Sequence, residues 1–153
     1  MKALQFSFLL LFLVSLNGSA QNISVVAEQG LKLGTFYITG TSSGSVSVNS
    51  TGSWSASSNI HSVNSTHSAA VFTLSTDSTE PINVQVDQPG AYLMNSKGDK
   101  LFLETTYASP QTVSIQQGVP AQMHLGGTLT VDAQAAPGDY TGELFVTFSI
   151  HNE

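Results

Sequence analysis

The chain has 153 residues, of which 41% are hydrophobic and only 9% charged, and its formal net charge at pH 7 is −6. It contains no cysteine, which argues against a disulfide framework, a thiolate metal site or a lipid attached to cysteine. Its 4 basic residues are all lysines and are scattered, whereas proteins that bind phosphate backbones cluster Lys and Arg. We therefore expect no nucleic acid partner.

The N-terminus has the three parts of a secretory signal peptide. Lys2 precedes the apolar residues 9–14, and the small residues Gly18 and Ala20 follow. The alternative is a membrane-spanning helix, which needs about 20 apolar residues and is longer than this run. We expect a signal peptide over residues 1–20, cleaved after Ala20, and an exported mature chain of residues 21–153 that does not span a membrane.

The mature region alternates apolar and polar residues with period two, and no stretch keeps helical spacing over three turns. Because side chains alternate across a strand, each such run predicts a strand with one buried face. In chain order, the predicted strands are residues 31–38, 45–49, 69–74, 82–86, 100–104, 112–116, 128–131 and 141–150.

The last of these runs defines its core face most clearly, and the first is interpreted by the same logic. In residues 31–38 we expect Leu31, Leu33 and Tyr37 to face the core. In residues 141–150 the expected core face consists of Leu144, Val146, Phe148 and Ile150, and Phe145 on the other face suggests partial cover there too.

Turn signals separate the strands. Residues 95–99 predict a hairpin turn and residues 136–139 a turn before the last strand. Residues 41–68, rich in Ser, Thr, Gly and Asn, predict either a weak two-stranded excursion or a long surface loop. Many short strands with turns between them predict an all-β fold: one antiparallel, immunoglobulin-like β-sandwich domain, with a barrel as the second choice.

The sequence offers no convincing catalytic constellation. Residues 40–44 match the G-x-S-x-G elbow of hydrolases, which requires a strand-to-helix turn, but a strand pattern follows instead. The four histidines lack metal-ligand spacing and the acids are scattered. We expect a protein that is not an enzyme and that holds no cofactor or metal.

Aromatic residues leave one ligand hypothesis open. Trp54 stands among polar neighbours that cannot bury it locally, so it is a candidate ligand contact. With the tyrosines it could build a sugar-stacking surface, although core or rim packing in a sandwich is the favoured interpretation. These tyrosines are Tyr37, Tyr92, Tyr107 and Tyr140.

Four short motifs occur along the chain in a characteristic order. They are L-G-T-F at residues 33–36, A-A-V-F-T-L at 69–74, L-G-G-T-L-T-V at 125–131 and P-G-D-Y-T-G-E-L-F-V-T-F at 137–148. This order resembles a bacterial exported domain family of unknown function, akin to spore-coat-U-like and fimbrial-subunit sandwiches. Leu33 stands where that family usually has Phe, and the chain ends in Ile-His-Asn-Glu rather than at an aromatic. The resemblance implies an immunoglobulin-like sandwich at the bacterial surface and no catalytic residues.

These observations favour a secreted or cell-surface structural or adhesive protein, such as a fimbria-like subunit that assembles by strand addition. Residues 21–27 could be the donated strand, with Ile23 and Val25 as its anchors. The alternative is that this segment is the first strand of its own domain. A second hypothesis is a carbohydrate- or ligand-binding module that uses Trp54. The expected partners are accordingly other copies, other surface subunits or a glycan.

Overall fold

The computed structural model describes residues 22–64, 66–106 and 108–151, so the predicted signal peptide over residues 1–20 lies outside the described residues. None of the described segments forms a helix that could cross a membrane. The described strands are β1 (Ile23–Gln29), β2 (Lys32–Leu33), β3 (Phe36–Ile38), β4 (Gly44–Val48), β5 (Trp54–Ala56), β6 (Ile60–Ser62), β7 (His67–Ser68), β8 (Ala70–Thr76), β9 (Ile82–Asp87), β10 (Ala91–Met94), β11 (Lys100–Thr105), β12 (Thr112–Ile115), β13 (Ala121–Leu125), β14 (Gly127–Val131) and β15 (Thr147–Ile150).

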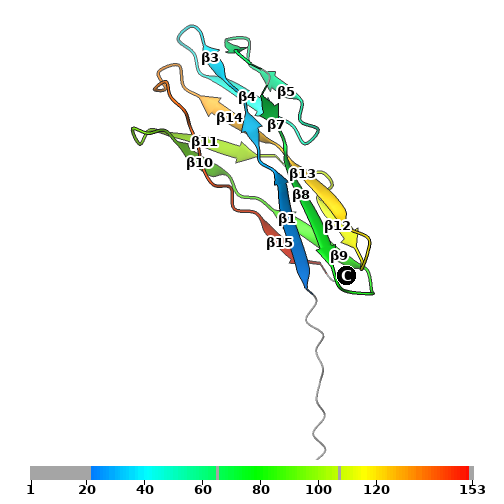
Figure 1. Ribbon diagram of the computed structural model, residues 1–153. Helices are drawn as coiled ribbons and strands as arrows, with labels where there is room; N and C mark the ends of the chain where they lie inside the picture. The colour runs from blue at the N-terminus through cyan, green and yellow to red at the C-terminus, as the bar shows by residue number, and fades with distance from the viewer. Residues whose placement is uncertain (1–21, 65, 107, 152–153) are drawn as a thin grey trace, which may run out of the picture.

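These strands pair antiparallel in an elongated two-layered sandwich (Figure 1), which confirms the predicted all-β fold. At one end, the sheet β1-β8-β13 faces the sheet β12-β9-β15. At the other end, the five-stranded sheet β10-β11-β14-β4-β5 packs against the short pairs β2-β7 and β3-β6.

Two adjoining core clusters hold the layers together. The first contains Leu74, Val84, Ile115 and Met123, contributed by four strands from both facing sheets. The second is built on the five-stranded sheet. Leu31 packs against both clusters, so the apolar interior is continuous along the molecule. Apolar burial on this scale is the main favourable contribution to the stability of a fold without disulfides.

Glycines mark the places where the chain changes direction. Gly34 adopts a φ of +83°, which ends β2 and starts a new alternation at Phe36. Phe36 therefore packs against the second core and Tyr37 is 53% exposed, so the prediction that Tyr37 faces the core was wrong. Gly126 joins β13 to β14, where the chain passes from one sheet to the other. A Cβ at this glycine would collide with the backbone oxygen of Val48.

The last predicted strand is only partly paired. Residues 147–150 form β15, and before them Thr141 makes an isolated bridge with Met94. Phe145 is 72% exposed, so the expected partial cover on its face is not found among the described residues. Residues 41–68 form short strands rather than one long loop, because β4 pairs with β5 while β6 and β7 pair with β3 and β2.

Candidate functional site

The first candidate site is the strand β1, which contains the predicted anchors Ile23 and Val25. β1 pairs with β8 at the end of its sheet, and Val25 lies opposite Leu74, a fully buried core residue. Residues directly opposite each other in an antiparallel pair point to the same face, so Val25 also faces the core side. It is nevertheless 38% exposed, and Ile23 is only partly buried.

The strand β15 ends the facing sheet in a similar way. Phe148 lies opposite Val86 and Ile150 opposite Val84, so both side chains point toward the first core, which covers them only in part. Phe148 meets Phe72 of β8 edge to face, with ring centroids 5.5 Å apart. Figure 1 draws β1 and β15 along the same part of the sandwich. We call this partly covered boundary the β1–β15 seam, formed by Ile23, Val25, Phe72, Phe148 and Ile150.

Trp54, the candidate ligand contact, lies in β5 at the end of the five-stranded sheet. Its ring is half-buried against the second core, and its indole N–H donates a hydrogen bond of 3.0 Å to the carbonyl of Leu33. The imidazole of His67 lies 6.5 Å away, centroid to centroid. Tertiary neighbours, not sequence neighbours, thus give Trp54 its cover, and its role as a ligand contact stays a prediction.

The G-x-S-x-G segment forms a turn between β3 and β4. Ser42 is exposed there, and its carbonyl accepts a hydrogen bond of 2.9 Å from Asn59 Nδ2. His61 Nε2 pairs with Thr39 Oγ1 at 3.3 Å rather than with Ser42. The hollow at this turn is lined by Ser, Thr, Asn and Gly, and among its described lining residues there is no histidine or carboxylate that could act as a base for Ser42.

The described histidines and acids do not converge. Within residues 22–64, 66–106 and 108–151, His, Asp and Glu side chains form no group of three or more that could hold a metal ion. Tyr140 donates its hydroxyl to the carbonyl of Ala136 at 2.7 Å, which gives this aromatic a structural role at a turn. Tyr107 lies outside the described residues.

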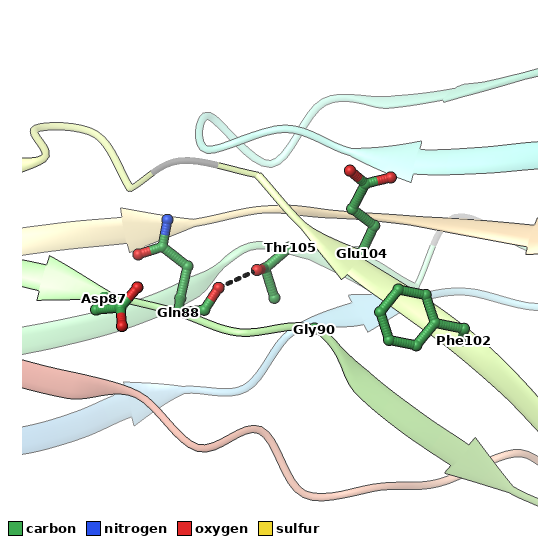
Figure 2. Close-up of a pocket in the computed structure, with 6 residues that line it drawn as sticks. All are labelled: Asp87, Gln88, Gly90, Phe102, Glu104 and Thr105. Atoms are coloured by element: carbon green, nitrogen blue, oxygen red, sulfur yellow. Dashed lines mark hydrogen bonds between the residues drawn. The ribbon is translucent and has the colours of Figure 1, made fainter.

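The second candidate site includes Tyr92, one of the tyrosines considered for a sugar-stacking surface, but its partner Phe102 and the hollow beside it were not predicted. Tyr92 and Phe102 lie directly opposite each other on β10 and β11, and they are 62% and 48% exposed. Beside them is a hollow of about 360 Å³, lined by Asp87, Gln88, Gly90, Phe102, Glu104 and Thr105 (Figure 2). The sequence did contain a signal for the exposure of Phe102. Leu101, Phe102 and Leu103 are consecutive in a predicted strand, so Phe102 lies on the face opposite the two leucines.

The geometry thus defines the class of the protein: an antiparallel β-sandwich domain with exposed strand edges and an exposed aromatic pair. The chain belongs to the family described as a domain of unknown function (DUF4402), whose model matches residues 23–149. This match confirms the resemblance to a family of unknown function. No curated protein matches the chain.

Proposed function

We propose that this protein is an exported structural subunit of a bacterial surface assembly, and that its copies join by strand exchange at the β1 edge. The observation that carries the proposal is the β1–β15 seam, where core-facing apolar side chains of two end strands are incompletely covered. Exposed strand edges are places where natural proteins add a strand from another chain unless the edge is blocked.

The composition of β1 supports its role as the exchanged strand. Six of its seven residues are exposed, so β1 buries little apolar surface in its own domain and little is lost when it leaves. Its ladder with β8 nevertheless runs from Ile23 opposite Thr76 to Gln29 opposite Val71. A β1 strand from a second copy could form the same ladder, because identical residues would meet in the same register.

The opposite edge of the seam supports the same proposal. No charged residue occurs in β15, and proline is absent from it, so it lacks two of the devices that protect edge strands from pairing with other chains. β9 pairs with β15 on one side, and the sheet ends on the other side of β15. A neighbouring copy that approaches along the seam would cover Phe148 and Ile150 as well as β1.

Disulfide trapping can test the exchange, because the chain has no cysteine of its own. Ser24 and Ser75 are register partners on β1 and β8. One protein would carry Ser24→Cys and another, with a mass tag, Ser75→Cys; the two would be unfolded, mixed, refolded together and oxidised. We expect a disulfide-linked heterodimer, because exchange places the thiol at position 24 of one copy beside the thiol at position 75 of the other.

The matched control uses Asn83→Cys and Ser114→Cys, register partners on β9 and β12. These strands are not proposed to exchange, so the control mixture should give only background cross-linking. The double variant Ser24→Cys/Ser75→Cys shows whether this pair can form a disulfide within one chain. If the double variant oxidises within the chain while the mixed single variants match the control background, β1 stays in its own domain and the proposal is wrong.

Deletion of residues 21–27 gives an independent measurement. We expect the truncated protein to be less stable and unable to form the oligomers of the full mature chain, because the β8 edge would lose its partner. A truncated domain that is as stable as the intact one, together with an intact protein that never polymerises, would also contradict strand exchange.

A further inference from the structure

The outward face of β10 and β11 carries aromatic side chains that the core does not require. Ala91 and Leu103, which are register partners, point inward and are 8% and 4% exposed. Their neighbours Tyr92 and Phe102 therefore point outward, and their ring centroids are 5.2 Å apart at an interplanar angle of 58°. This pair, which we call the aromatic platform, offers two ring surfaces to solvent on the β10–β11 hairpin.

A glycine next to the platform makes room for the Phe102 ring. A Cβ at Gly90 would collide with the ring of Phe102 and would lie 2.8 Å from the carbonyl oxygen of Leu103. The absence of that atom lets the Phe102 ring lie over the backbone at the edge of the hollow of about 360 Å³ (Figure 2). The hollow thus has an aromatic wall on one side.

A third exposed aromatic residue lies in the irregular segment that precedes β15. Thr147 pairs with Asp87 and Thr141 pairs with Met94, so the chain between them runs beside residues 88–93. Phe145 lies in that stretch and is 72% exposed. From Leu144 to Ile150 the residues are alternately half-buried and exposed, so Phe145 lies on the exposed side with Thr147, opposite to the side of Phe148.

The polar groups of the hollow accept hydrogen bonds more readily than they donate them. Asp87 and Glu104 are exposed carboxylates, and among the described residues neither a lysine nor a histidine lines the hollow. The hydroxyl of Thr105 already donates to the carbonyl of Gln88 at 2.6 Å. A complementary ligand must therefore bring donors, and it must carry no negative charge beside the two carboxylates.

We propose that the aromatic platform and this hollow bind a non-acidic saccharide chain. A pyranose ring combines a face of C–H groups, which stacks on aromatic rings, with a rim of hydroxyl donors, which suits carboxylate acceptors. A second copy docked through the same face is less well suited, because it would bring its own Asp87 and Glu104 to the contact. The site lies away from Trp54, and it does not depend on strand exchange.

The test begins with the mature protein on an array of neutral, amino-bearing and acidic glycans, followed by titration calorimetry with the best soluble ligand. We expect binding to neutral or amino-bearing oligosaccharides and none to uronic or sulfated ones. Tyr92→Ala and Phe102→Ala should each weaken binding at least tenfold. Gly90→Ala should weaken it too, because the new Cβ displaces the Phe102 ring.

Tyr37→Ala is the matched control, because Tyr37 is 53% exposed on β3 and does not belong to the platform. It should bind as the unmodified protein does, and so should Trp54→Phe. Glu104→Lys is a change at an exposed residue that leaves the aromatic rings in place, and it should weaken the binding of an amino-bearing oligosaccharide. This variant tests the proposal if a platform variant fails to fold. The proposal is overturned if no non-acidic glycan binds at millimolar concentration. It is also overturned if folded Tyr92→Ala and Phe102→Ala bind as tightly as Tyr37→Ala.

Discussion

Replacement of Asn95 by alanine should be among the most damaging polar substitutions in this fold. Asn95 is 7% exposed and is the only polar side chain that is buried in the described residues. Its Oδ1 accepts hydrogen bonds from the backbone N–H groups of Lys97 at 3.0 Å and Asp99 at 2.9 Å. Its Nδ2 donates to Asp99 Oδ2 at 2.8 Å and to the hydroxyl of Tyr140 at 3.3 Å. One amide thus joins the β10–β11 hairpin to the turn before the last strand.

The expected loss of stability follows from the three shorter hydrogen bonds of Asn95. At about 1 kcal/mol each, their loss in Asn95→Ala should lower the free energy of unfolding by about 3 kcal/mol. Asn49 is a matched control with a similar set, since its Oδ1 accepts from the N–H of Thr51 at 3.0 Å, the hydroxyl of Thr51 at 2.7 Å and the N–H of Ser53 at 2.9 Å. Asn49 is exposed, so water can replace these bonds, and Asn49→Ala should cost about 1 kcal/mol or less.

Urea unfolding followed by far-ultraviolet circular dichroism measures both variants. With a slope of about 1.5 kcal/mol/M, the midpoint should fall by about 2 M for Asn95→Ala and by well under 1 M for Asn49→Ala. Equal shifts for the two variants would refute the reasoning, because burial would then not distinguish the two amides. Weakened saccharide binding by a folded Asn95→Ala protein would follow from a loosened hairpin, since Asn95 ends the segment that carries Tyr92.

The same unfolding measurement checks three further changes. Met123→Ala removes a side chain that is 1% exposed and should lower the free energy of unfolding by about 2–5 kcal/mol. Met94 is 44% exposed, so Met94→Ala should change it by no more than about 0.5 kcal/mol. Similar values for the two variants would contradict the assigned core. Gly34→Ala should cost about 1–2 kcal/mol, since its φ of +83° disfavours a Cβ, and a neutral result would show that the turn relaxes. Trp54→Phe loses the bond to Leu33 and should cost about 1 kcal/mol, and no loss would mean that water replaces that bond.

Local pattern identified most of the strands in advance. The alternation in residues 82–86 became β9, whose residues are buried and exposed in turn, and the predicted hairpin at residues 95–99 lies between β10 and β11. The period-two alternation of apolar residues is enough to predict such strands, because one face of a strand in a sandwich must be apolar. The same logic failed at Tyr37, since a glycine with positive φ breaks the strand and inverts the face that follows.

The candidate sites depended on contacts between distant residues. Ile23 and Val25 were identified as apolar anchors from the sequence, but only their pairing with β8 placed Val25 on the core side of a strand that ends its sheet. Trp54 looked exposed among serines, yet Leu33 and the second core give it cover from 21 residues away. A local window of sequence contains neither contact.

The sequence by itself determined the class of fold and its family, because alternation, turn residues and short motifs are local or ordered along the chain. Only the tertiary structure decided which strands end a sheet and which aromatic residues remain in solvent. Both depend on how strands far apart in sequence pair and on which sheet covers which face. Tyr92 and Phe102 form a platform because the hairpin pairs them while Ala91 and Leu103 fill the interior.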